Sequence, residues 1–322
     1  MHSLSIRLLG LCLIAVACTS LPPIAEPVTE VIEIESVDFP GRLWDPWMPP
    51  LSDGAEVTIH GSLTIPATDT AVPAVILLHG CGGIGGSERG WVDDLRDKGY
   101  ASFLLDSFGG RGIGEICSGT ETLNVASPIV DLFRAVEALR DHAYIDGTRI
   151  AAVGFSFGGR TALWSAMSRF QEAYGGSTLA AHIAFYPSTC FIRLEAETEV
   201  SEAPIRILHG IEDDWTPIDQ CEEYAGRLAD AGVDAELIAY PAAHHGFDNE
   251  TLPPAGTMPI AAPSPRGCEF EEIEGQIIDP DTGEVAGVGS PCVQIGVQVG
   301  YNREAHTAAK ADLFELLDGV FS

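Results

Sequence analysis

The segment that most constrains the fold is Gly154-Phe155-Ser156-Phe157-Gly158-Gly159, which directly follows the apolar run Arg149–Val153. The apolar run predicts a buried strand, and the glycines allow this strand to turn sharply into a helix. The side chain at the apex of such a turn projects outward, which would present the hydroxyl of Ser156 to a substrate. A serine hydroxyl becomes a nucleophile only when a neighbouring base removes its proton. The rest of the chain must then supply a histidine, an acid to orient it, and donors for an oxyanion.

Apolar strands alternate with amphipathic helices on both sides of this turn. Strands are predicted at Val72–Leu78, Tyr100–Asp106, around Ile150, and at Ala181–Tyr186, Pro204–Leu208 and Ala235–Tyr240. Helices are predicted at about Glu88–Lys98, Ile129–His142, from Gly159, and at Ile218–Ala231 and Glu304–Leu317. This pattern indicates an α/β fold with a mostly parallel central sheet covered by helices on both faces. The alternating segment Glu56–Ile65 is predicted to be an antiparallel edge strand.

The N-terminal segment has the features of an export signal. A weakly basic start precedes the apolar stretch Leu8–Val16, so residues 1–18 are predicted to be a signal peptide. Ala15-Val16-Ala17-Cys18 resembles a bacterial lipobox, which would place a lipid on Cys18 and anchor the protein in the outer membrane. Ordinary cleavage nearby, giving a periplasmic protein, is the alternative. The lipid on Cys18 is the only membrane attachment that we expect.

The remaining residues divide into a tether and one domain. Residues 19–53, rich in proline and acidic residues, are predicted to be a tether followed by an extended arm. Residues 54–322 form the predicted α/β domain, which is interrupted by an acidic, Pro- and Gly-rich insertion at residues 249–299. A small hairpin is expected within this insertion at residues 275–285. The insertion either covers the site as a lid or packs elsewhere.

Six cysteines lie outside the predicted signal peptide. An even number in an exported protein suggests disulfides, and pairing of sequence neighbours gives 81–117, 190–221 and 268–292. Free buried thiols are the alternative. The spacing of the six cysteines does not match a zinc site.

Acidic residues greatly outnumber basic ones and set the formal net charge at −30. Such a surface repels nucleic acid and anionic lipid headgroups, so neither is an expected partner. We also expect self-repulsion that added salt would screen, which would raise the stability of the fold. An acidic exported protein without salt adaptation is the alternative.

The histidine is expected in the loop that follows the strand Ala235–Tyr240. Imidazole suits general-base chemistry because its unperturbed pKa lies near physiological pH. His245, which precedes Gly246-Phe247, is the predicted base. The adjacent His244 would point in another direction.

The acid is expected after the strand Pro204–Leu208. A carboxylate on the second ring nitrogen of the histidine fixes its tautomer and stabilises the imidazolium. Asp213 is preferred over Asp214 for this role. Asp214 could instead cap the helix that begins at Ile218.

The oxyanion donors should be backbone N–H groups from the residue after the nucleophile and from a loop after an earlier strand. Phe157 supplies the first donor, and Cys81 in His79-Gly80-Cys81-Gly82-Gly83 supplies the second. Cys81 itself lacks a nucleophile turn and is not the predicted nucleophile.

These motifs together resemble the dienelactone hydrolase family of α/β-hydrolases. The resemblance covers about residues 55–248 and the last helix, and it rests on the oxyanion loop, Asp106-Ser107-Phe108-Gly109, the Ser156 turn, residues 210–217 and His245-Gly246-Phe247. It implies an α/β-hydrolase fold with Ser156, Asp213 and His245 as a catalytic triad. The founding dienelactone hydrolases carry cysteine at the nucleophile position, and serine there is similar to the general esterase-type members. The insertion at 249–299 departs from the compact family pattern.

Two further side-chain groups have both a functional and a structural interpretation. Arg111 could bind a substrate carboxylate or form a structural ion pair, and the ion pair is the preferred interpretation. The acidic hairpin around Asp279, Asp281 and Glu284 could bind calcium, although it lacks the regular spacing of an EF-hand loop, and a solvated turn is the preferred interpretation.

The sequence thus predicts an exported serine hydrolase that cleaves an ester or related acyl bond of a small molecule, with no cofactor and no metal. A peptidase or polyester hydrolase on the same fold is the first alternative. A catalytically inactive binding protein of the cell envelope is the second. No pattern in the chain indicates an oligomeric state.

Overall fold

The computed structural model describes residues 21–43, 45, 47–119, 123–254 and 258–322. Its centre is an eight-stranded sheet in the order β1-β2-β4-β3-β5-β6-β8-β9. The strands are β1 (Val28–Asp38), β2 (Ala55–Ile65), β3 (Val72–Leu78), β4 (Ala101–Asp106), β5 (Ile145–Phe155), β6 (His182–Phe185), β8 (Ile205–Gly210) and β9 (Ala235–Tyr240). From β4 to β9 all neighbours are parallel, whereas β1 and β2 are antiparallel to their neighbours. The predicted α/β fold with a mostly parallel sheet is confirmed.

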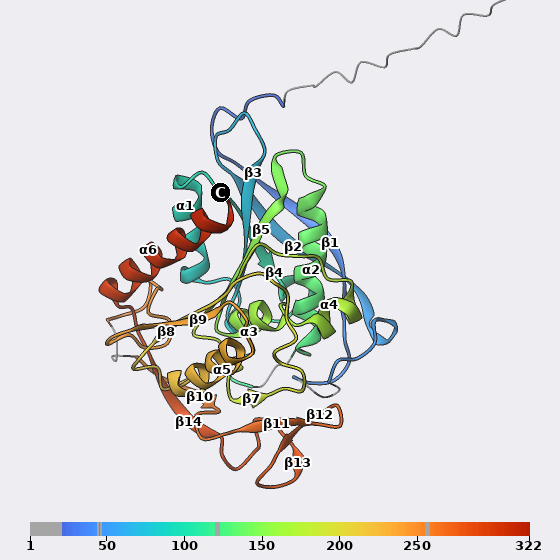
Figure 1. The fold of residues 1–322 in the computed structure, drawn as a ribbon, viewed down its shortest axis with the longest axis vertical. Helices are drawn as coiled ribbons and strands as arrows, with labels where there is room; N and C mark the ends of the chain where they lie inside the picture. The colour runs from blue at the N-terminus through green and yellow to red at the C-terminus, as the bar shows by residue number, and fades with distance from the viewer. Residues whose placement is uncertain (1–20, 44, 46, 120–122, 255–257) are drawn as a thin grey trace, which may run out of the picture.

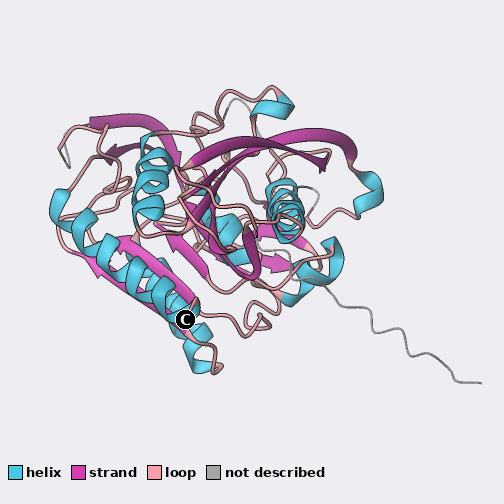
Figure 2. Ribbon diagram, turned by 90° about the horizontal axis from the view of Figure 1, so that it is seen from above, coloured by secondary structure: helices cyan, strands magenta, loops and turns pink. Residues whose placement is uncertain are grey.

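Helices cover both faces of the sheet, as Figures 1 and 2 show. They are α1 (Gly86–Asp97), α2 (Ala126–Arg140), α3 (Phe157–Trp164), α4 (Ser168–Tyr174), α5 (Ile218–Asp230) and α6 (Arg303–Val320). Helices α1 and α6 pack on one face through side chains such as Trp91 and Leu313. Helices α2 to α5 pack on the other face, where Phe133 and Leu163 are fully buried. Because successive strand residues point to opposite faces, Val75 and Ile76 of β3 enter different cores.

The predicted position of Glu56–Ile65 at the sheet edge is wrong. Strand β2 is antiparallel as expected, but β1 pairs with it over its whole length, from Val28 opposite Ile65 to Asp38 opposite Ala55. Part of the segment predicted as an extended arm therefore belongs to the central sheet. The sheet begins at residue 28, ahead of the expected boundary at residue 54.

Residues 258–299 of the predicted insertion form small sheets beside the central one. Strands β10 (Met258–Ser264) and β14 (Gln294–Val299) pair with each other. Strands β11 (Phe270–Ile273), β12 (Gln276–Asp279) and β13 (Glu284–Val285) form a second small sheet. The predicted hairpin is confirmed as β12–β13. This sheet is joined to the body because β11 pairs in parallel with β7 (Ile192–Arg193), and it lies below the helices in Figure 1.

All three predicted disulfides are present: Cys81–Cys117, Cys190–Cys221 and Cys268–Cys292. The predicted signal peptide, with Cys18, lies outside the described residues. In the part of the chain that is described, every helix is too short or too polar to cross a bilayer.

Candidate active site

The sharp turn between β5 and α3 holds Ser156 in a strained conformation. Its φ is +54° and its ψ is −108°, a region that non-glycine residues rarely occupy. The surrounding backbone is too close for side chains: a Cβ on Gly154 would lie 2.0 Å from the carbonyl oxygen of Gly158. A Cβ on Gly158 would lie 2.1 Å from the carbonyl oxygen of Leu78. The glycines of the motif are therefore required by this close approach of β5, α3 and the end of β3.

Three predicted residues meet at the carboxyl ends of the strands. His245 Nε2 lies 2.9 Å from Ser156 Oγ, and His245 Nδ1 lies 2.8 Å from Asp213 Oδ2. All three residues are nearly buried. Asp214 lies elsewhere, since its Oδ1 accepts a hydrogen bond from the N–H of Gln298. The geometry thus pairs Ser156 with His245 and His245 with Asp213.

Asp213 is held in place by several donors besides the imidazole. Its Oδ1 accepts hydrogen bonds from the N–H groups of Trp215 and Thr216, each at 2.9 Å, and its Oδ2 accepts one from the Thr216 hydroxyl at 3.1 Å. Burial alone would raise the pKa of Asp213. The charge of His245 and its hydrogen bond outweigh this and lower the pKa of Asp213 below its usual value. A carboxylate kept ionised in this way can stabilise an imidazolium.

Aromatic rings fix the orientation of the imidazole. The His245 ring lies 4.5 Å from the Tyr186 ring and 4.8 Å from the Trp215 ring, measured between centroids. Tyr186 is itself anchored, because its hydroxyl donates to buried Asp248 at 2.5 Å. The Trp91 indole donates to the same carboxylate at 2.9 Å. The base is therefore held by packing as well as by its hydrogen bonds.

The loop after β3 brings a second backbone donor to the pocket. The Glu88 carboxylate of α1 accepts hydrogen bonds from the N–H groups of Gly80 and Gly85, which holds the loop from beneath. The Cys81–Cys117 disulfide and the hydrogen bond from Ile116 N–H to the Cys81 carbonyl attach the loop to residues 116–117. Among the described residues, neither the N–H of Cys81 nor that of Phe157 has a hydrogen-bond acceptor. Both groups are free to bind an oxygen of a substrate.

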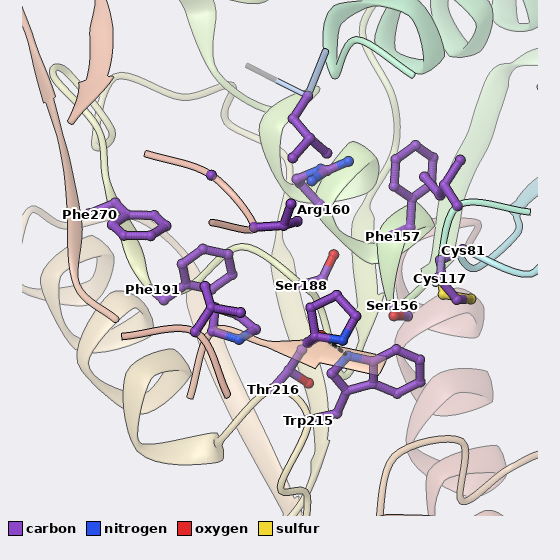
Figure 3. A pocket seen from close by; sticks show the side chains of 17 residues that line it. Cys81, Cys117, Ser156, Phe157, Arg160, Ser188, Phe191, Trp215, Thr216 and Phe270 are labelled. Carbon is purple, nitrogen blue, oxygen red and sulfur yellow. Dashed lines mark hydrogen bonds between the residues drawn. A yellow bond between two sulfur atoms is a disulfide. The ribbon is translucent and has the colours of Figure 1, made fainter. Parts of the chain in front are cut away.

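A cavity of about 130 Å³ opens beside Ser156, and Figure 3 shows the side chains around it. The insertion supplies part of its wall, so it lies at the site. The lining residues are Leu43, Cys81, Ile116, Cys117, Ser156, Phe157, Arg160, Ser188, Phe191, Trp215, Thr216, Pro263, Pro265, Phe270, Gly287, Val288 and Val293. Most of these side chains are apolar or aromatic, as is usual for a site that binds a small organic molecule.

Arg111 does not line this cavity; it forms a structural ion pair, which was the preferred of its two interpretations, and the structure does not support a contact with the substrate. Its side chain is 1% exposed and forms a bidentate pair with Asp131, with bonds of 2.8 and 2.9 Å. Asp38 lies 3.4 Å from the same guanidinium. These two carboxylates occupy the guanidinium, and Arg111 joins β1 to α2.

The acidic hairpin forms a turn stabilised by its own backbone. Asp279 Oδ1 accepts a hydrogen bond from the N–H of Asp281 at 3.1 Å. Within the described ranges, no group of three or more His, Cys, Asp or Glu side chains is arranged to hold a metal ion.

Sequence reasoning missed two parts of the pocket. Arg160 lines it four residues after Ser156, on the face of α3 that the strand-to-helix turn directs toward the cavity. Its place one helical turn beyond the nucleophile was the signal that could have identified it. The wall that residues 263–293 supply depends on the pairing of β11 with β7, and no local pattern marks this pairing.

The fold and the site define an α/β-hydrolase, and comparison with known proteins gives the family. The model of the dienelactone hydrolase family matches residues 59–266, which is more than half of the chain. The chain therefore belongs to the dienelactone hydrolase family, as the motifs had indicated.

Individual relatives have low sequence identity to this chain. An uncharacterized peptidase of Bacillus subtilis, YuxL, is 25% identical over 228 residues, which are 61% of this chain and 35% of that protein. A probable 2-oxo-3-(5-oxofuran-2-ylidene)propanoate lactonase from Bradyrhizobium is 24% identical over 192 residues, 58% of this chain and 77% of that protein. This chain thus spans about a third of the length of the first relative. A dienelactone hydrolase-like promiscuous phosphotriesterase from metagenomic libraries shares the fold, with a TM-score of 0.55, 16% identity, and 91% and 99% of the two chains covered.

Proposed function

We propose that the chain is an exported serine hydrolase that cleaves an ester bond of a small molecule through an acyl-enzyme. The observation that carries this proposal is the continuous hydrogen-bonded series from Ser156 through His245 to Asp213, beside two free backbone N–H groups. Nucleophile, base, orienting acid and oxyanion donors are the parts that acyl transfer requires.

Each part has a defined role in this mechanism. Ser156 Oγ attacks the carbonyl carbon while His245 Nε2 takes its proton. The N–H groups of Cys81 and Phe157 bind the resulting oxyanion. His245 then gives the proton to the leaving alcohol, and the acyl group stays on Ser156. A water molecule, deprotonated by His245, attacks the acyl-enzyme and releases the acid.

Export is supported by the cysteines. Three disulfides in one chain are typical of an oxidising compartment and are rare in the cytosol. The predicted signal peptide at residues 1–18 points to the same location. The N-terminus and the mass of the mature protein isolated from cells would show whether Cys18 carries a lipid.

An ester is favoured over an amide because a lactone, the bond named for the Bradyrhizobium relative, is a cyclic ester. The Bacillus subtilis relative, described as a peptidase, makes a peptide bond the second candidate. Matched p-nitrophenyl ester and p-nitroanilide substrates with the same acyl group separate the two.

The test of the catalytic assignment is Ser156→Ala. This variant should lose turnover of p-nitrophenyl acetate by several orders of magnitude and lose labelling by a fluorophosphonate probe. Ser188→Ala removes another hydroxyl of the same pocket and should still be labelled. Near-wild-type turnover by Ser156→Ala would refute the nucleophile, and an unlabelled wild-type protein would favour an inactive binding protein.

A further inference from the structure

The active-site cavity contains a buried cation with no anion beside it. Arg160 is 4% exposed, and its Nη2 atom has no hydrogen-bond partner among the described residues. No carboxylate of the described chain forms an ion pair with it. Burial is the one influence on its pKa, which falls to about 9, so the guanidinium is still charged at pH 7.

Other arginines that are buried or half-buried in this chain are paired with a carboxylate. Fully buried Arg111 binds Asp131. Half-buried Arg169 binds Glu272 at 2.6 Å, and half-buried Arg227 binds Glu197 at 2.5 Å. A guanidinium removed from water without a counter-ion costs several kcal/mol. With 47 acidic residues in the chain, an arginine left unpaired inside the catalytic pocket points to an anion that arrives with the substrate.

Aromatic rings hold the guanidinium in place without neutralising it. The Arg160 guanidinium lies 4.5 Å from the Phe157 ring centroid and 5.5 Å from that of Trp164. Such contacts favour the cation and restrict its motion, and they leave its N–H donors available. The planar fork of an arginine matches a carboxylate in a bidentate arrangement.

The cavity limits the size and charge of the group that can reach Arg160. Its volume of about 130 Å³ is close to that of an apolar cavity that holds a benzene molecule, roughly 150 Å³. Ser156 and Arg160 both line this cavity, Ser156 just before α3 and Arg160 within its first turn, so one small molecule can contact both. No second cation is among the described residues that line the pocket, which favours a singly charged carboxylate over a doubly charged phosphate.

We propose that Arg160 binds a free carboxylate on the acyl portion of the substrate, so that this chain prefers a hemi-ester: a short or ring-sized dicarboxylic acid with one carboxyl esterified and the other ionised. This inference rests on the proposed function, because Ser156 must attack the esterified end. Arg160 then sets specificity through the distance between the two carboxyl groups.

The test compares two esters that differ only in charge. Methyl 4-carboxybenzoate carries the anion, and methyl 4-carbamoylbenzoate replaces it with a neutral amide of nearly the same shape. The wild-type protein should prefer the anionic ester in kcat/KM by roughly 10- to 100-fold, the range for a hydrogen bond to a charged group. Arg160→Gln should abolish this preference, and Arg160→Lys should restore part of it. Arg227→Gln, which removes a half-buried arginine that does not line this pocket, should keep the preference.

Binding to the wild-type protein decides the matter if the Arg160 variants fail to fold or neither ester is turned over. Ligand-observed NMR should give a dissociation constant for benzoate at least about 10-fold below that for benzamide. Equal binding, or equal kcat/KM for the two esters, would overturn the role of Arg160. If Ser156→Ala still abolishes turnover of the neutral ester in that case, the proposed function stands without this inference. Full turnover by Ser156→Ala would instead refute the function itself.

Discussion

The three disulfides allow the role of the oxyanion loop to be measured apart from overall stability. Cys81–Cys117 closes a loop of 36 residues, and Cys190–Cys221 closes one of 31. Loop-closure entropy gives a stabilisation of about 3.8 kcal/mol for the first and about 3.7 kcal/mol for the second. Replacing either pair with serines should therefore lower the free energy of unfolding by nearly the same amount. Only the first pair carries a predicted oxyanion donor, the N–H of Cys81.

The catalytic effect of the two double variants should differ. Complete loss of one oxyanion donor costs about 10²–10³ in kcat. Without its disulfide the loop keeps the hydrogen bonds from Gly80 and Gly85 to Glu88 and the bond from Ile116 to Cys81. We therefore expect a smaller loss, about 10-fold in kcat, with KM much less affected.

The assay is turnover of p-nitrophenyl acetate, with urea denaturation of each double variant to confirm equal destabilisation. Measurements are made well below the unfolding transition of both proteins. Equal kcat values for Cys81→Ser/Cys117→Ser and Cys190→Ser/Cys221→Ser would show that the disulfide has no part in positioning the donor.

Three further predictions follow from single side chains and from the net charge. Asp213→Asn should reduce kcat for p-nitrophenyl acetate about 10⁴-fold, because the amide no longer fixes the histidine tautomer. Asp214→Asn should change kcat less than 10-fold in the same assay. A larger loss of kcat in Asp214→Asn than in Asp213→Asn would refute the assignment of the acid. Burial lowers the pKa of His182 to about 4, so its neutral form stabilises the fold above pH 6.5. This contribution, about 3 kcal/mol, is lost as the pH falls to 4. In His182→Gln the free energy of unfolding should therefore decrease less between pH 6.5 and pH 4 than in the wild-type protein, whereas the same change at exposed His60 should leave the decrease as it is. At a net charge of −30 the melting temperature should rise between low and high NaCl, and a flat or falling value would exclude dominant self-repulsion.

The parts of the site that carry local signals could be predicted from the sequence. Ser156 stands in a glycine pattern that only a crowded turn requires, and His245 and Asp213 each follow a predicted strand of the sheet. Parallel strands bring their carboxyl ends to one edge, so three loops that are distant in the chain had to converge. The disulfide partners followed from closeness in sequence.

The parts that depend on non-local pairing could not be predicted in this way. Strand β1 has the alternation of a sheet strand, with Ile34 between Glu33 and Glu35, but its position outside β2 depends on register over 11 residue pairs. The position of the insertion depends on the two-residue contact between β7 and β11. The structural role of Arg111 depends on its contact with Asp131, which lies 20 residues away on another element.

The contrast between the surface and the pocket determines how Arg160 can act. A chain of net charge −30 repels an anionic substrate, but at physiological ionic strength that repulsion is screened beyond about 8 Å. The guanidinium acts only at contact, inside a mostly apolar cavity where a charge-assisted hydrogen bond is strong. The surface therefore gives no electrostatic steering toward the site, and selection between a hemi-ester and a neutral ester has to arise after entry. Such selection lowers the dissociation rate of the anionic substrate and leaves its association rate unchanged, because the cation that binds it is buried.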